Sequence, residues 1–169
     1  RYGGKLLGIC GGFQMLGSAV VDPDGEEGIA GETEGLCMLP LTTTIKKSKE
    51  LAQVEGVTTE KFPFGKAGLT FSGYEIHAGE TLFSGAKAVP LTVRSRLGND
   101  VDQEEGAVSE DGMVFGSYTH GFFDRTPIRA ALWQWLCRRK GLDESLVSAV
   151  EINTTVAFDR LADQLEEIL

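Results

Sequence analysis

The stretch GGKLLGICGGFQMLG, from Gly3 to Gly17, decides the fold of this chain. Its apolar run Leu6–Cys10 predicts a short buried strand, and Gly12–Val20 predicts the start of a helix with one apolar face. Two glycines follow Cys10 directly, so the chain passes from strand to helix within a few residues. A thiol therefore stands at a turn of the kind that glycine adopts most easily.

The pattern G-x-C-x-G from Gly8 to Gly12 has the spacing of a nucleophile elbow built on cysteine. Such a turn forces the nucleophile into a strained backbone conformation, so the flanking residues must be small, as Gly8 and Gly12 are. The dipole and the free N–H groups of the following helix point at the sulfur and favour the thiolate. The same residues also fit a buried packing cysteine beside a tight turn, and the pattern alone does not decide between the two.

Two other glycine-rich motifs do not fit this stretch. A phosphate-binding loop ends in Gly-Lys-Ser/Thr, whereas the nearest lysine, Lys5, precedes the turn. A dinucleotide-binding fingerprint requires G-x-G-x-x-G, which the glycines from Gly8 to Gly17 do not supply. Nucleotide binding at this turn is therefore excluded.

A cysteine nucleophile in acyl chemistry needs a general base, usually histidine, and the chain has two histidines. His120 ends an apolar strand in VFGSYTHGFFD, and sites of this kind form at the carboxyl ends of parallel strands. His77 lies inside the alternating pattern of SGYEIHAGE. We predict His120, rather than His77, as the base. For either residue the alternative is an ordinary histidine bonded to the backbone.

The rest of the chain mixes strands and helices. After an acidic loop at Asp22–Gly35, strands are predicted at residues 39–47, 51–61, 73–83, 88–96 and 106–123, with Asp111-Gly112 as a hairpin turn. A helix is predicted from Thr126, its expected N-cap, to Gly141, which ends it. Its apolar stripe comprises Ile128, Ala131, Leu132, Trp135 and Leu136. A last amphipathic helix is predicted from Phe158 to Leu169. This mixture indicates an α/β fold.

Composition narrows the classes of partner. The 169 residues carry a net charge of −9, which argues against nucleic acid as the main partner. No apolar run reaches the ~18–20 residues of a membrane span, and no signal peptide opens the chain. Cys10, Cys37 and Cys137 have no metal-binding or disulfide spacing, so we expect a reducing, cytoplasmic compartment, no metal, and packing roles for Cys37 and Cys137.

Several segments together resemble the class I (triad) glutamine amidotransferases, and within them the glutaminase domains of the cobyric acid synthase family. The segments are LLGICGGFQMLG, EGLCMLPLTTT, SGYEIHAGET, FGSYTHGFFD and FDRLADQLEE. The resemblance covers nearly the whole chain, from Leu6 to Glu167. It implies a flavodoxin-like mixed sheet with flanking helices. Residues 1–169 would form the C-terminal part of the glutaminase domain, with its N-terminal strands missing.

The resemblance also implies a chemistry. Cys10 would attack the side-chain amide of glutamine, His120 would act as the base, and ammonia would be released. An upstream synthetase domain, which this chain lacks, would use ATP and Mg²⁺ to amidate four carboxylates of adenosylcobyrinic acid a,c-diamide. No cofactor is expected in the glutaminase domain itself. The acidic chain repels a polycarboxylate corrinoid, so we expect that substrate to bind the synthetase domain.

Two departures from the wider family concern the site. Many relatives carry His-x-Glu, whereas Phe122 stands two residues after His120 and the nearest acid is Asp124. This absence also resembles the cobyric acid synthase family, but it leaves open what orients His120. In addition, Gly11 supplies one oxyanion donor, while the second comes from a loop upstream of the elbow. We therefore expect the isolated chain to hydrolyse glutamine poorly.

Three further side chains are candidates for contacting substrate. The resemblance places Gln14, on the first turn of the elbow helix, against the substrate amino acid. Alternation in SGYEIHAG predicts that Tyr74, Ile76 and Ala78 face the core, which leaves Glu75 and His77 together on the other face. These two side chains could orient glutamine or contact the synthetase domain, and a plain exposed strand face is equally consistent.

The chain begins at Arg1 and reaches its first predicted strand within five residues, so we expect it to be a fragment. A separate N-terminal piece or a second copy of the chain is then expected to cover the edge of Leu6–Cys10. Two other functions remain open. One is a glutaminase for another acceptor, such as cobyrinic acid or a cell-wall lipid precursor, and the other is a non-catalytic scaffold that keeps the fold for binding.

Overall fold

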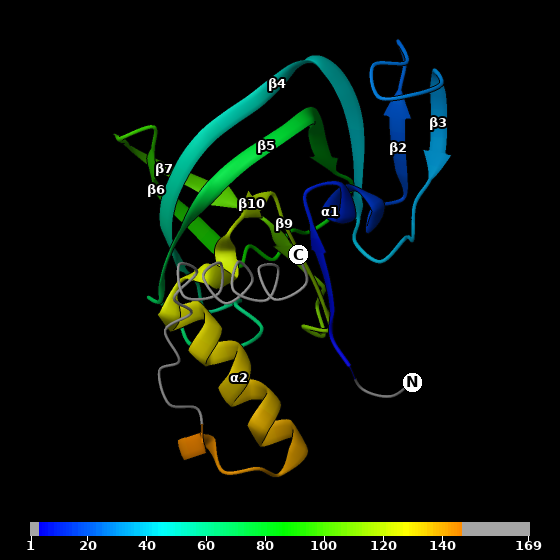
Figure 1. Cartoon of the computed structure of the whole chain (residues 1–169). Coiled ribbons are helices and arrows are strands. Elements are labelled where there is room, and N and C mark those ends of the chain that lie inside the picture. The colour runs from blue at the N-terminus through cyan, green and yellow to red at the C-terminus, as the bar shows by residue number, and fades with distance from the viewer. Residues whose placement is uncertain (1–3, 147–169) are drawn as a thin grey trace, which may run out of the picture.

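The computed structural model describes residues 4–146, apart from the side chains of residues 50 and 146. The described chain has a mixed α/β fold, as expected, in which most of the strands follow one another and few helices flank them (Figure 1). The strands are β1 (Leu6–Ile9), β2 (Ala19–Asp22), β3 (Gly31–Glu34), β4 (Leu41–Thr58), β5 (Thr70–Phe83), β6 (Leu91–Arg96), β7 (Asn99–Glu105), β8 (Ala107–Val108), β9 (Val114–Ser117) and β10 (Thr119–His120). The helices are α1 (Gly11–Met15), α2 (Thr126–Lys140) and the 3-10 turns η1 (Phe122–Asp124) and η2 (Glu144–Leu146).

A small sheet with the order β1-β9-β8 carries the elbow. Strands β1 and β9 are parallel, with Leu6 opposite Val114 and Ile9 opposite Ser117. Strand β8 runs antiparallel to β9 and is joined to it by the predicted hairpin turn, in which the Gly112 N–H donates to the Ser109 carbonyl. Because β1 and β9 are parallel, their carboxyl ends lie at the same edge of this sheet.

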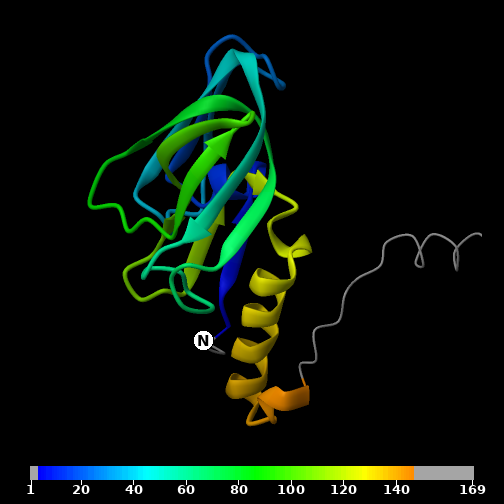
Figure 2. The same cartoon turned by 90° about the vertical axis from the view of Figure 1, so that its left-hand side faces the viewer.

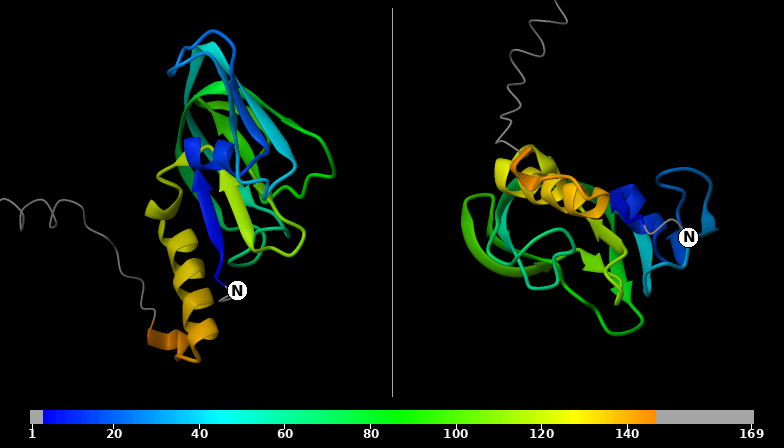
Figure 3. Two further views of the ribbon diagram at one scale, coloured as in Figure 1. Left: turned by 90° about the vertical axis from the view of Figure 1, so that its right-hand side faces the viewer. Right: turned by 90° about the horizontal axis from the view of Figure 1, so that it is seen from below.

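A larger sheet with the order β10-β5-β4-β2-β3, to which β6 and β7 are added beside β4, curves around the small one. Viewed from two further directions, the pair β2–β3 lies on the opposite side of α1 from β6 and β7 (Figure 3). The segments predicted at 39–47 and 51–61 are one strand, β4, whose register to β5 shifts between Thr44 and Lys49. A bulge of this kind bends a strand without ending its pairing.

The main core is a cluster of aromatic side chains between the strands and α2, which lies along one side of them (Figure 2). Edge-to-face pairs join its rings, with centroids 5.3–6.2 Å apart; the rings belong to Phe62, Phe64, Phe71, Phe115, Phe122 and Trp135. From α2, the predicted stripe supplies the buried Ile128 and Ala131, with Leu132 and Trp135 packed at the margin. The helix ends at Gly141 in the left-handed conformation, as predicted.

Several local predictions were wrong. The elbow helix stops at Met15 instead of running to Val20, because the β-branched pair Val20–Val21 joins β2 and pairs with β4. Strand β1 is half exposed at Leu6 and Leu7, since it is the edge strand of its sheet in the described chain. The N-cap of α2 is Arg125, one residue before the predicted Thr126. The predicted helix at 158–169 lies outside the described residues.

The alternation of β5 is reversed at its centre. Tyr74 and Ile76 are 47% and 41% exposed, whereas Glu75 is 5% exposed. Of the predicted core set only Ala78 is buried. Glu75 points inward, where Arg96 of β6 forms an ion pair with it. Strand β7 itself was missed, because its sequence NDVDQEE is acidic and Val101 is its only typical strand-forming residue.

Among the described residues, α2 is the longest helix, and none is both long and apolar enough to cross a lipid bilayer.

Phe122 offers a test of this core. Its ring is fully buried and contacts the rings of Phe62, Phe71 and Phe115. Phe122→Ala is expected to lower the free energy of unfolding by about 3–5 kcal/mol, because a large cavity replaces the ring. Urea unfolding followed by tryptophan fluorescence measures the change. Leu82→Ala, at an exposed position of β5, is the control and should change stability by less than about 0.5 kcal/mol; equal losses in both variants would contradict the assigned core.

Candidate active site

Cys10 has the strained backbone expected of an elbow, with φ 55° and ψ −116°. A non-glycine residue in a conformation of this kind costs on the order of 1–3 kcal/mol, so the surroundings must enforce it. The Cys10 N–H donates to the Ser117 carbonyl at 2.9 Å, and the Cys10 carbonyl accepts from the N–H groups of Phe13 and Gln14. The turn is therefore held between β9 and the first turn of α1.

Gly8 is the glycine that the elbow needs for close approach. A Cβ atom at Gly8 would lie 2.6 Å from the Gly12 carbonyl oxygen and 2.7 Å from a methyl group of Leu16. A Cβ at Gly11 or Gly12 would meet no described atom within 4 Å. The α1 helix begins at Gly11, so the amide predicted as oxyanion donor belongs to the first turn, whose N–H groups have no partner within the helix.

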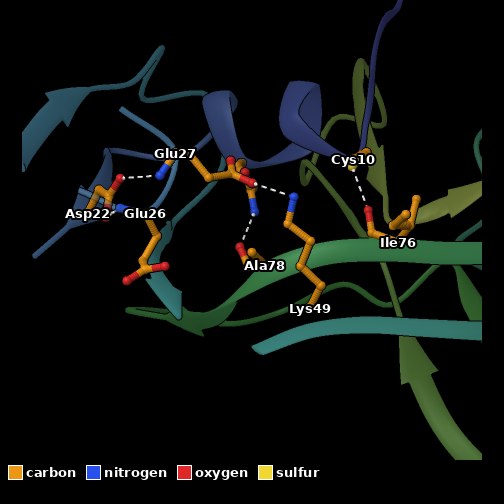
Figure 4. A network of polar contacts seen from close by, with 8 residues as sticks. Cys10, Asp22, Glu26, Glu27, Lys49, Ile76 and Ala78 are labelled. Atoms are coloured by element: carbon orange, nitrogen blue, oxygen red, sulfur yellow. Dashed lines mark hydrogen bonds and ion pairs between the residues drawn. The ribbon is translucent and has the colours of Figure 1, made fainter. Parts of the chain in front are cut away.

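The thiol of Cys10 lies against β5. Its Sγ is 3.2 Å from the carbonyl oxygen of Ile76, a contact in which a protonated thiol donates (Figure 4). Cys10 is partly exposed.

His120 is held against the same stretch of β5. It pairs with Tyr74 across the antiparallel ladder, and the two rings stack with centroids 5.1 Å apart and an interplanar angle of 7°. A Cβ at Gly73 would lie 2.0 Å from the His120 carbonyl oxygen, so only glycine allows β10 this close. Nε2 of His120 is buried and has no hydrogen-bond partner within residues 4–146. The ring is thus fixed in place while one nitrogen stays available.

Both candidate catalytic residues therefore lie against β5. Cys10 follows β1 and His120 follows β9, its parallel neighbour. The thiol meets β5 at Ile76, and the imidazole meets it at Tyr74, two residues away. Among the described residues no hydrogen bond joins the Cys10 thiol to Nε2 of His120, and their roles as nucleophile and base stay predictions.

Glu75 and His77 lie elsewhere. Both line a cavity of about 800 Å³ on the other face of β5, together with Arg96, Glu105 and Tyr118, and neither Cys10 nor His120 is part of its lining. His77 stacks on Tyr118 with centroids 3.9 Å apart, and Glu75 forms an ion pair with Arg96. The structure brings these two predicted residues together, in a cavity that neither Cys10 nor His120 lines.

Gln14 is buried rather than open to a substrate. Its Nε2 lies 3.4 Å from the Ala78 carbonyl and 3.5 Å from the Tyr118 hydroxyl, as the contact beside α1 in Figure 4 shows for Ala78. The Tyr118 hydroxyl in turn bonds Thr81 at 2.5 Å. Gln14 thus ties α1 to β5, and a role in contacting glutamine stays a prediction.

Sequence reasoning missed Glu105, at the end of β7. Its carboxylate accepts the Tyr118 N–H at 2.7 Å and the Ser117 hydroxyl at 2.9 Å. Burial raises its pKa from 4.5 to about 7, while these two hydrogen bonds act in the opposite direction and the nearby Glu75 adds to the increase. Glu105 stands in an acidic run that reads as a solvated surface, so the sequence held no signal for it.

Within residues 4–146, no three His, Cys, Asp or Glu side chains gather in a way that could hold a metal ion.

Comparison with known proteins matches this chain to one family. Residues 1–128 match the model of the CobB/CobQ-like glutamine amidotransferase domain. Similar curated proteins include the cobyric acid synthases of Shewanella oneidensis (40% identity over 179 residues), Photobacterium profundum (39% over 170) and Aliivibrio fischeri (35% over 169). Each alignment covers all of this chain and 31–33% of the relative, so the chain spans about a third of their length.

The stack of Tyr74 on His120 predicts a change in histidine reactivity. Because an aromatic pair is worth about 1 kcal/mol, Tyr74→Ala should free the ring and raise the rate of His120 acylation by diethyl pyrocarbonate about fivefold. Peptide mass spectrometry resolves His120 from His77, whose own rate is the internal reference. Tyr74→Phe keeps the stack and should leave the rate unchanged; acceleration in both variants would show that the stack does not hold the ring.

Glu105 predicts how stability depends on pH. Since its pKa in the folded chain is about 7, the folded state holds a proton between about pH 4.5 and 7 that the unfolded chain has released. Stability should therefore fall as pH rises through this window, by at most about 3 kcal/mol. Urea unfolding at pH 5 and pH 8 measures the difference, which Glu105→Gln should reduce. Glu104→Gln, at an exposed neighbouring carboxylate, should keep it; identical differences in all three proteins would refute the assignment.

Proposed function

The chain belongs to the family of CobB/CobQ-like glutamine amidotransferase domains, and from this premise we propose that it hydrolyses glutamine to supply ammonia for an amidation reaction. The observation that carries the proposal is the placement of Cys10 in a strained strand-to-helix turn, with its thiol at the stretch of β5 against which His120 stacks. Cys37 also has a positive φ and is exposed, so what distinguishes Cys10 is its place between β1 and α1, with its thiol on the strand against which His120 stacks.

The proposed reaction follows from these groups. His120 takes the proton of the Cys10 thiol, and the sulfur attacks the side-chain amide carbon of glutamine. The Gly11 N–H, at the start of α1, stabilises the oxyanion of the tetrahedral intermediate. Collapse of this intermediate breaks the C–N bond, and the imidazolium protonates the leaving nitrogen to give ammonia and a thioester. Water, deprotonated by His120, then hydrolyses the thioester to glutamate and restores the thiol.

For the acceptor, we propose the carboxylates of a corrinoid. The similar curated proteins are named cobyric acid synthases, and this chain corresponds to about a third of each. In this proposal a synthetase domain binds ATP, Mg²⁺ and adenosylcobyrinic acid a,c-diamide, and the present domain binds glutamine in the cytoplasm. The net charge of −9 supports this division, because an acidic domain repels a polycarboxylate substrate.

The nucleophile and base can be tested by substitution. Cys10→Ala should lower glutamine hydrolysis by at least ~1,000-fold and abolish labelling by a diazoketone analogue of glutamine, because no thiol remains to attack. His120→Ala should lower hydrolysis by about 100- to 10,000-fold. Glutamate release gives the rates and intact mass gives the labelling.

The controls separate these roles from general damage. Cys37→Ser, at an exposed thiol, should leave hydrolysis and labelling unchanged. A larger loss in His77→Ala than in His120→Ala would reverse the choice of base. Labelling that persists in Cys10→Ala would reject the nucleophile.

The acceptor needs a second experiment. Joined to the synthetase domain of a relative, the Cys10→Ser domain should fail to support amidation with glutamine yet leave amidation with free ammonia intact, because only ammonia production depends on the thiol. Equal loss of both activities would contradict the proposed division between the domains.

A further inference from the structure

Glu105, at the end of β7, binds a segment that contains His120 and that also hydrogen-bonds the backbone of Cys10. The segment is Ser117–His120, at the end of β9 and in β10. Glu105 Oε2 accepts the Ser117 hydroxyl at 2.9 Å, and Oε1 accepts the Tyr118 N–H at 2.7 Å. Glu105 is buried, with 6% of its surface exposed, and burial strengthens these hydrogen bonds.

Ser117 connects this grip to both sides of the site. Its carbonyl accepts the Cys10 N–H at 2.9 Å, and its hydroxyl oxygen accepts the Thr119 N–H at 3.0 Å. Thr119 precedes His120, and both pair with β5. The carboxylate of Glu105 thus fixes Ser117, which anchors the Cys10 turn, and Tyr118. Through the hydroxyl of Ser117 it also holds Thr119, the residue before His120.

We propose that Glu105 is the positioning residue of this site: by holding Ser117 and Tyr118 it keeps the thiol of Cys10 and the imidazole of His120 in register. It does so without touching either group, and it acts in the place of a carboxylate bonded directly to the histidine. The inference rests on the proposed function for its catalytic consequence, but the alignment of the two residues can be measured separately.

The ionisation of Glu105 links this grip to pH. Both bonds are donated to the carboxylate, and they are strongest when it is charged. Burial raises its pKa to about 7, so the charge forms in the neutral range. The charged groups around it are Glu75, which raises the pKa, Lys87, which lowers it, and Arg96, which pairs with Glu75. The titratable His77 and Tyr118 also line the shared cavity, and Glu104 is the adjacent exposed acid.

The test compares four forms of the 169-residue chain: wild type, Glu105→Ala, Glu105→Gln and Glu104→Gln. Two rates are measured from pH 5.5 to 9: glutamine hydrolysis, and alkylation of Cys10 by iodoacetamide, read by peptide mass spectrometry. Glu105→Ala should lower kcat about 10- to 100-fold with KM changed less than about threefold, because alignment and not binding is lost.

Glu105→Gln keeps an acceptor for the Tyr118 N–H and a partner for the Ser117 hydroxyl, so its kcat should stay within about threefold of wild type. It should also lack the step near pH 7 that wild type and Glu104→Gln show in both rates. If Glu105 had only a structural role, Glu105→Gln would have the same pH profile as wild type.

Two results would overturn the proposed role of Glu105. Equal kcat in Glu105→Ala and Glu104→Gln at every pH, or the same pH profile in Glu105→Gln and wild type, overturns the proposal. If Glu105→Ala does not fold, the profile of Glu105→Gln still decides it. If wild type releases no glutamate even when joined to the synthetase domain of a relative, the proposed function fails, while the pH profile of Cys10 alkylation continues to test the positioning.

Discussion

The parallel pairing of β1 with β9 is the constraint on which the candidate site depends. Cys10 and His120 are far apart in the chain, and both lie against β5 because each follows one of these two strands. The last bond of this pairing continues past the strands, where the Cys10 N–H donates to the Ser117 carbonyl. A shift of one residue in this register would move the sulfur to the other face of the sheet, so the register must be firmly held.

The packing on both faces of β9 holds that register. On one face the Phe13 ring of α1 lies so close to β9 that a Cβ at Gly116 would sit 2.0 Å from it. On the other face Phe115 belongs to the aromatic cluster that also contains Phe122 and the buried stripe of α2. Displacing β9 along β1 would break contacts in both layers at once. The strain at Cys10 is therefore offset by packing that the site residues themselves do not supply.

Local signals explain what the sequence could predict. The elbow, the Asp111-Gly112 hairpin and the end of α2 at Gly141 each depend on a few neighbouring residues, and the structure has all three. The faces of β5 were predicted wrongly because alternation assumes that apolar side chains face the core. Here the buried partner of Glu75 is Arg96, which is 21 residues away in the chain and which no local pattern joins to it. Glu105 was missed for the same reason, since its partners are Ser117, at the end of β9, and Tyr118, between β9 and β10.

The core also explains why no acid stands two residues after His120. That position is Phe122, whose ring is fully buried among Phe62, Phe71 and Phe115, so a carboxylate there would be enclosed by apolar rings. An orienting group for His120 must come from another direction. The structure offers two such supports: the ring of Tyr74, which stacks on the imidazole, and the backbone of β10, which Gly73 admits close to β5. A histidine held by stacking and by its backbone needs no direct acid partner. The carboxylate of Glu105 then acts without touching the imidazole, by holding the backbone of Tyr118, two residues before His120.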